Sequence, residues 1–343
     1  MVQILLNFFG TLFSKGYNYF MKLMEAVPNF SEGRRTDVIN TIVRRVADVS
    51  RAKVLNVDSN ADANRTVLTL AGEAQEVRKS ALELFKATRE LLDMRTHHGA
   101  HPRLGAVDVC PFVPIADMTL AEAAAEARQL GQQVAELNIP VYFYEKNSAT
   151  PERQNLAFLR RGEYESLPKK LQELPPDLGP QTYTESVAKT GASVIGARNF
   201  LLAYNISLNT TDITPAKQIA ALLREKNGGL KAVKAIGWLM PGYQAAQVSF
   251  NLTDFYKTGM AEVFEACRRE AGKLGLSVTG SELIGLAPLE ALLRAGRFYA
   301  PIQTEEYTLV QTAITRLGLN YIRPFSPREK ILEYRLADEK ISR

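Results

Sequence analysis

Apolar residues along the first half of the chain alternate between strand-like runs and helical spacing. The apolar and β-branched runs predict strands at 22–30, 52–58, 65–72, 106–115 and 141–145. Apolar residues three and four apart predict amphipathic helices at 36–50, 73–93 and 119–138, the last with Thr119 as its cap. The predicted order is therefore β-α-β-β-α-β, followed by α-β.

The same order of six elements recurs in the second half. Strands are expected at 199–209, 231–240, 245–254 and 276–288, helices at 213–226 and 260–274, and two more helices near 288–299 and 304–317. This order is that of the split βαβ, or ferredoxin-like, arrangement. The expected fold class is α+β, with two ferredoxin-like (split βαβ) subdomains, facing sheets, outer helices and a ligand cleft between them.

Composition shifts mark the expected boundaries. The segment 167–192 is rich in Pro, Gly, Thr and Ser, which is typical of a boundary and a ligand loop. We expect an N-terminal subdomain at 21–178, a linking loop at 179–192, a C-terminal subdomain at 193–335 and a tail at 336–343. Residues 1–20 carry Lys15 as their only charge and match neither a signal peptide nor a membrane span. They are expected to be a disordered or non-native extension, with peripheral membrane contact as the alternative.

Composition and charge change this prediction little. The chain is 46% hydrophobic and 23% charged, with a net charge of +5, which suits anionic small ligands as well as nucleic acid. Its two cysteines, Cys110 and Cys267, are far apart and form no CxxC motif. We therefore expect a cytoplasmic location and no disulfide framework.

All three histidines of the chain, His97, His98 and His101, lie within five positions. The spacing of His97 and His101 would suit a zinc site on a helix, but Gly99 and Pro102 disfavour a helix and no further ligand is near. Two interpretations stay open: loop histidines with local hydrogen bonds, and a functional loop on a rigid scaffold. Imidazole is the natural proton carrier near neutral pH.

Asp58 ends a predicted strand just before a polar turn. Ordinary turn chemistry explains an aspartate there, and a carboxylate that orients an imidazole is the alternative. The chain has no GxSxG, Walker A or GxGxxG motif, and Cys110 lies in an apolar strand. These absences favour direct transfer aided by a general base over a covalent enzyme intermediate.

Seven long motifs resemble the formiminotransferase family, in the family's order and over about 21–335. They are VPNFSEGR (27–34), DSNADANRTV (58–67), HHGAHPRLGAVDVCPFVPI (97–115), GARNFLLAYNISL (196–208), GLKAVKAIGW (229–238), AQVSFNLTDF (246–255) and FSPREKILEY (325–334). The resemblance implies a transferase that moves the formimino group of N-formiminoglutamate to N5 of tetrahydrofolate. The implied products are glutamate and 5-formiminotetrahydrofolate, in histidine degradation.

The resemblance also assigns residues. The family's catalytic histidine falls on His101 and its strand-end aspartate on Asp58. Candidates for substrate carboxylates or the folate tail are Arg65, Arg103 and Arg198. The implied folate-binding residues are Gly179, Pro180, Gln181, Thr182, Tyr183, Thr184, Thr190 and Gly191. Tetrahydrofolate is expected as co-substrate with no metal, in a homodimer that binds neither nucleic acid nor membrane and works with a separate cyclodeaminase.

Three other functions compete with this interpretation. A glutamate formyltransferase that uses N-formylglutamate differs by one oxygen-for-nitrogen exchange in the substrate. A nucleic-acid-binding module would carry an RNP1-like aromatic run, and the chain has none. A non-catalytic folate-binding protein would not need His101 and Asp58. The residues give His98 no role.

Overall fold

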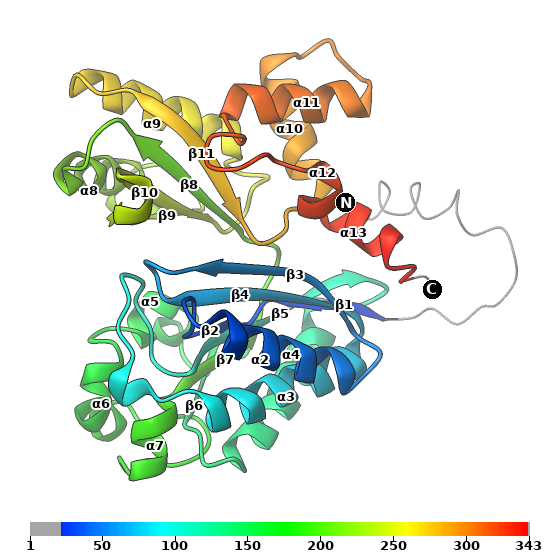
Figure 1. Cartoon of the computed structure of the whole chain (residues 1–343), viewed down its shortest axis with the longest axis vertical. Coiled ribbons are helices and arrows are strands. Elements are labelled where there is room, and N and C mark those ends of the chain that lie inside the picture. Colours follow the sequence, from blue (N-terminus) through cyan, green and yellow to red (C-terminus); the bar gives the residue numbers. More distant parts are fainter. Residues whose placement is uncertain (1–21, 342–343) are drawn as a thin grey trace, which may run out of the picture. The chain divides into compact units, whose positions relative to one another are not determined.

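The computed structural model of the chain describes residues 22–341 and has a mixed α+β fold (Figure 1). It divides into two compact units: one runs to Arg198 and takes in the last residues from Lys340, and the other spans Asn199–Glu339. Each unit has its own sheet and its own apolar core. The expectations for 1–20 lie outside the described residues.

The first unit is built on a seven-stranded sheet. Its strands are β1 (Leu23–Ala26), β2 (Asn29–Phe30), β3 (Lys53–Asn60), β4 (Arg65–Glu73), β5 (Val107–Ala116), β6 (Val141–Glu145) and β7 (Ser193–Ala197). β4 lies between β3 and the interrupted strand β1–β2, which pairs with β5 on its other side, and all these pairs are antiparallel. β7 then runs parallel to both β5 and β6.

Three helices cover this sheet: α2 (Thr36–Asp48), α3 (Ala74–Leu91) and α4 (Leu120–Ala135). α3 contacts both α2 and α4, and all three contact strands of the sheet. The predicted Thr119 cap is confirmed, because its side chain accepts a hydrogen bond from the Glu122 amide and Glu122 bonds back to the Thr119 amide. The helices therefore bury the apolar face that their spacing indicated.

The segment 167–192 holds more regular structure than its Pro and Gly content indicated. It contains α6 (Leu167–Glu173), with Pro in its first turn, and α7 (Glu185–Thr190), capped by the Thr184 side chain. Strand β7 follows, and the sequence pattern did not predict it. Because β7 pairs inside the first sheet, the chain passes to the second unit at Arg198–Asn199, after the expected linker 179–192.

The second unit has a four-stranded sheet in the order β11-β8-β10-β9, with every pair antiparallel. Its strands are β8 (Leu202–Leu208), β9 (Val233–Met240), β10 (Ala245–Leu252) and β11 (Val278–Ile284). Its helices are α8 (Ile213–Leu223), α9 (Met260–Lys273), α10 (Leu289–Tyr299), α11 (Glu306–Leu317), α12 (Pro327–Lys330) and α13 (Leu332–Asp338). α13 runs into the expected tail. No helix within 22–341 has the length and apolar character needed to cross a bilayer.

Candidate active site

The histidine segment is a loop between the short 3-10 turn η1 (Met94–Thr96) and β5. Gly99 lies so close to the neighbouring 60–65 turn that an added Cβ would be 2.2 Å from the Ala63 carbonyl oxygen. The amide of Ala100 donates to the Asp62 carbonyl at 3.0 Å. Glycine is therefore required here because two backbones meet.

Asn64 connects three loops that lie far apart in the sequence. It adopts a positive φ of 47°, a conformation that asparagine tolerates. Its side-chain oxygen accepts from the Gly33 amide at 3.0 Å, and its side-chain nitrogen donates to the His98 carbonyl at 2.9 Å. The loops that contain 27–34, 58–67 and 97–105 are thereby fixed to one another.

His97 is a structural member of this network. It is 8% exposed, and its Nε2 lies 2.8 Å from the Asn64 carbonyl oxygen. Arg103 Nε donates to His97 Nδ1 at 3.2 Å, so Nδ1 accepts and Nε2 carries the ring proton. Burial lowers the pKa of His97, and the ring is neutral at pH 7.

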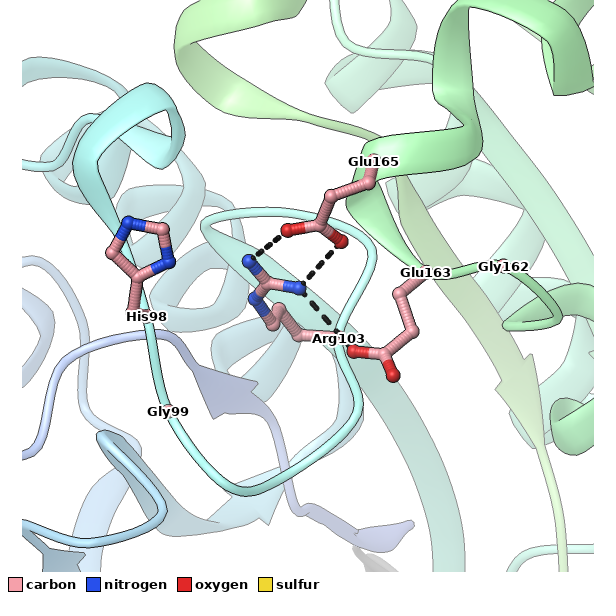
Figure 2. Close-up of a pocket in the computed structure, with 6 residues that line it drawn as sticks. All are labelled: His98, Gly99, Arg103, Gly162, Glu163 and Glu165. Carbon is pink, nitrogen blue, oxygen red and sulfur yellow. Dashed lines mark hydrogen bonds and ion pairs between the residues drawn. The ribbon is translucent and has the colours of Figure 1, made fainter.

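Arg103, expected to bind substrate, is already fully engaged (Figure 2). Its guanidinium donates to both oxygens of Glu165 at 2.7 and 2.8 Å and to Glu163 at 3.2 Å. Burial alone would lower the pKa of Arg103, but these carboxylates outweigh it and raise the pKa. Arg103 and five neighbouring residues line a cavity of about 340 Å³: His98, Gly99, Gly162, Glu163 and Glu165. His98 is exposed at this cavity.

His101 lies in a different environment, four residues further along the loop. Its Nδ1 is 2.7 Å from the Pro102 carbonyl oxygen, which can only accept a hydrogen bond. Nδ1 therefore carries the ring proton and Nε2 carries the lone pair. Burial first, and then the charges of Arg65 and Arg160, hold the pKa of His101 well below its ordinary value. Its neutral ring offers a proton acceptor at Nε2.

The charges beside His101 centre on Asp108, a fully buried aspartate in β5. Arg65 Nη1 donates to Asp108 at 2.6 Å, Arg160 donates from Nε at 3.2 Å and also from Nη2, and the Leu104 amide adds a bond at 2.9 Å. Burial alone would raise the pKa of Asp108, but the two arginines outweigh it and hold that pKa far below its ordinary value. Burial lowers the pKa of Arg65 to about 10.

Asp58, the expected partner of the catalytic histidine, is buried in β3 opposite Val67 of β4. The charge of Asp108 also acts on His101 and raises its pKa, against the larger effects of burial, Arg65 and Arg160. Sequence reasoning missed both Asp108 and Arg160. One signal was available for Asp108, since it is the only charged residue in the apolar run AVDVCPFVPI.

The expected folate loop falls into an exposed part and a buried part. Gln181–Thr184 is exposed, and the Tyr183 hydroxyl lies 3.3 Å from that of Tyr164. Thr190 and Gly191 are buried, and the Thr190 carbonyl accepts from the Ala106 amide at 2.7 Å. The buried part therefore holds the strand after the histidine loop, while the exposed part, with neighbouring Gly179 and Pro180, offers surface to a ligand.

Arg198, the third arginine assigned to substrate, comes directly after β7. It is half-buried, its amide donates to the Phe112 carbonyl at 3.0 Å, and its side chain hydrogen-bonds the Tyr144 hydroxyl. Burial outweighs this bond and raises the pKa of Tyr144 to about 12. Of the three arginines assigned to substrate, only Arg65 is among the charges that act most strongly on the pKa of His101.

Within residues 22–341 no group of three or more His, Cys, Asp or Glu side chains could hold a metal ion. Cys110 and Cys267 are both buried and unpaired with each other, and burial raises the pKa of each thiol. Both cysteines are core residues.

Comparison with known proteins gives this geometry a family. Residues 23–198 match the N-terminal subdomain of the formiminotransferase domain, and residues 203–337 match the formiminotransferase domain. The chain belongs to the formiminotransferase family. The network around Asn64 is thus built from the motifs that suggested this family, and the family's two matched regions coincide closely with the two units of the structure.

Several formiminotransferase relatives are similar over most of this chain. The formimidoyltransferase-cyclodeaminase of Sus scrofa is 46% identical over 91% of the chain, and the match covers 60% of the relative. The chain thus spans about three fifths of the bifunctional relatives. The glutamate formimidoyltransferases of Streptococcus pyogenes and Thermoplasma acidophilum are each 40% identical, over 83% and 81% of the chain and over 96% and 92% of their own lengths.

Proposed function

We propose that this chain is a glutamate formimidoyltransferase that moves the formimino group of N-formiminoglutamate to N5 of tetrahydrofolate, as a step in histidine degradation. The names of the Streptococcus and Thermoplasma relatives support the reaction, since each is matched over nearly its whole length. The observation that carries the proposal is His101, a neutral imidazole whose lone pair is on Nε2, in the loop that the family motifs hold. Such a group can accept the proton that this transfer releases.

The reaction needs one proton carrier. N5 of tetrahydrofolate attacks the formimino carbon, and a tetrahedral intermediate forms. His101 Nε2 takes the proton from N5, and the same imidazolium then protonates the glutamate nitrogen as its bond to the formimino carbon breaks. The products are 5-formiminotetrahydrofolate and glutamate, and His101 returns to its neutral form.

The lowered pKa of His101 suits the second half of this cycle. Because burial disfavours the imidazolium, a protonated His101 gives its proton readily to the departing amine. Asp58 is proposed to support the site from β3 as a buried carboxylate. No metal takes part in this scheme.

The proposed folate position uses the loop 179–191. Its exposed residues Gln181, Thr182, Tyr183 and Thr184 offer hydroxyl, amide and aromatic groups to a pterin and its tail. Each sheet contains four strands in the order of a split βαβ arrangement, β3-β4-β1-β5 in the first unit and β9-β10-β8-β11 in the second, and this supports the proposal of two ferredoxin-like subdomains. Arg103 and Arg198 are proposed to act on substrate through the loops they hold.

The wider assignments follow the family. We place the protein in the cytoplasm as a homodimer, without nucleic-acid or membrane partners. A separate cyclodeaminase is proposed to release ammonia from the product.

A paired assay tests the proposed function. Purified protein and His101→Gln are offered tetrahydrofolate with N-formiminoglutamate or N-formylglutamate in separate reactions. We expect formimino transfer by the wild type and a loss of about 10²- to 10⁴-fold in the variant, the usual contribution of a positioned acid–base group. Transfer of formyl alone would assign the protein as a formyltransferase. Folate binding without transfer of either group would make it a non-catalytic folate-binding protein.

A further inference from the structure

Two guanidinium groups share one buried carboxylate beside His101. Arg65 and Arg160 both donate to Asp108, which has no exposed surface. Within residues 22–341 neither arginine forms an ion pair with any other carboxylate. One negative charge balances only one of the two guanidinium groups, so the cluster carries a surplus positive charge.

A surplus charge in a buried place is unfavourable unless a counter-ion joins it. Burial lowers the pKa of Arg65 to about 10, although Asp108 lies beside it. The charges of the cluster act on His101, which cannot balance them because its ring is neutral or positive. A negatively charged ligand that contacts the two arginines would balance this surplus charge.

Each arginine keeps one nitrogen for that ligand. Arg65 uses Nε on Asn29 and Nη1 on Asp108, and Arg160 uses Nε and Nη2 on Asp108. Arg65 Nη2 and Arg160 Nη1 donate no hydrogen bond to any of the described residues. The two side chains are 9% and 14% exposed, so each has a small opening to the surface. Paired guanidinium donors at a partly desolvated place are typical of carboxylate recognition.

We propose that Arg65 and Arg160 form the binding position for the α-carboxylate of the amino-acid donor. This inference rests on the proposed function, because it concerns the glutamate part of N-formiminoglutamate. His101 must reach the glutamate nitrogen, and the α-carboxylate is attached to the carbon that bears this nitrogen. The γ-carboxylate is two methylene groups further away and extends from the cluster.

Arg103 does not offer an equivalent position. Its guanidinium donates to Glu165, Glu163 and both the ring and the carbonyl of His97, so all its N–H groups already form hydrogen bonds.

Binding of a carboxylate at Arg65 and Arg160 would also affect the proton transfer at His101. A bound carboxylate cancels the surplus charge, so His101 becomes a better proton acceptor only when the donor is in place.

The binding test uses the full chain labelled with ¹⁵N-histidine. Only three imidazoles give signals, and the His97→Gln, His98→Gln and His101→Gln variants assign them. L-glutamine keeps the α-carboxylate and replaces the γ-carboxylate by an amide, while L-isoglutamine does the reverse. We expect saturable shifts of the His101 signals with L-glutamate and L-glutamine, and at least tenfold weaker binding of L-isoglutamine. Binding of L-isoglutamine that equals or exceeds that of L-glutamine overturns the proposal.

Matched variants test the same position in the reaction. Arg160→Gln removes the guanidinium group, and Arg160→Lys keeps the positive charge without the paired nitrogens of a guanidinium. Arg161→Gln, at the exposed neighbouring residue, is the control. We expect Arg160→Gln to raise KM for N-formiminoglutamate at least tenfold while Kd for tetrahydrofolate stays unchanged, Arg160→Lys to have an intermediate effect, and Arg161→Gln to have none.

The outcomes separate the two proposals. If Arg160→Gln transfers the formimino group normally, with an unchanged KM for N-formiminoglutamate, the proposed binding of the α-carboxylate by Arg65 and Arg160 is overturned. The proposed function stays intact in that case. His101 shifts with L-glutamine in a protein that transfers neither group support the position and overturn the proposed function. If Arg160→Gln does not fold, Arg160→Lys and the comparison of L-glutamine with L-isoglutamine on the wild type still decide the question.

Discussion

The two ends of the histidine loop contain the same side chain in opposite roles. At one end, the His97 ring bonds to the Asn64 carbonyl and to Arg103, and Nε2 carries its proton. At the other end, His101 bonds to the Pro102 carbonyl through Nδ1, and Nε2 carries the lone pair. In each ring, the hydrogen-bond partner of one nitrogen fixes which nitrogen carries the proton. Both nitrogens of His97 therefore form hydrogen bonds within the protein, whereas Nε2 of His101 can act as a base.

The charges around the two rings differ in the same way. Arg103 beside His97 pairs with two carboxylates, those of Glu163 and Glu165, so no positive charge is left over at that end of the loop. Arg65 and Arg160 beside His101 share the single carboxylate of Asp108. The balanced end is suited to stability, and the unbalanced end is suited to a charged ligand.

The largest effect is expected from Asp108→Asn, which removes the shared carboxylate but keeps its shape. Two buried guanidinium groups then lose their counter-ion, and the free energy of unfolding should fall by about 3–5 kcal/mol. Urea unfolding followed by circular dichroism measures this loss. Glu173→Gln, on an exposed ion pair with Lys169, is the control and should change stability by less than about 1 kcal/mol. A loss below that limit for Asp108→Asn would contradict the role of the cluster.

The next effect distinguishes the two histidines. His97→Gln should lower the free energy of unfolding by about 1–3 kcal/mol, because it leaves buried partners of the ring without a hydrogen bond. Its effect on transfer should be smaller than that of His101→Gln, which should leave stability nearly unchanged. Unfolding curves and initial rates on both variants make the comparison. Equal losses of rate in the two variants would show that the loop acts as one unit.

The smallest effect is a dependence of stability on pH. Burial lowers the pKa of both His97 and His101 in the folded protein, so below about pH 6.5 the unfolded chain binds more protons than the folded one. Stability should therefore fall as the pH falls from 7 to 5.5, by up to about 1.4 kcal/mol per pH unit for each histidine. Urea midpoints across this range measure the slope. His97→Gln should reduce the slope, and an unchanged slope would assign it to other groups.

The sequence allowed much of the fold to be predicted because local patterns are strong in most of its elements. Helix α4 begins with the predicted Thr119 cap, and the apolar and β-branched runs located the strands β3, β4, β5 and β6 of the first sheet and all four strands of the second. Strand β7 was missed because five residues that follow a Pro- and Gly-rich segment carry too little local signal. Its identity depends on β5 and β6, far away in the chain, which present it with two pairing edges.

The site could be predicted only where its residues are close in sequence. The histidine loop was found from its composition, and His101 from the family motif. Asp108 and Arg160 are 52 residues apart, and no local pattern indicates that they meet. Arg103 was expected to bind substrate, and its carboxylate partners Glu163 and Glu165 were not foreseen because they lie about 60 residues further along the chain.

The position of β7 between β5 and β6 has a consequence for synthesis on the ribosome. β6 joins the other strands of the described sheet only through β7, so the first unit cannot close its sheet until residue 197 has left the exit tunnel. Until then the nascent chain presents the free backbone edge of β5, which is the kind of surface that chaperones cover and that other chains can pair with. Protection of this unit during translation is thus set by the arrival of a five-residue strand.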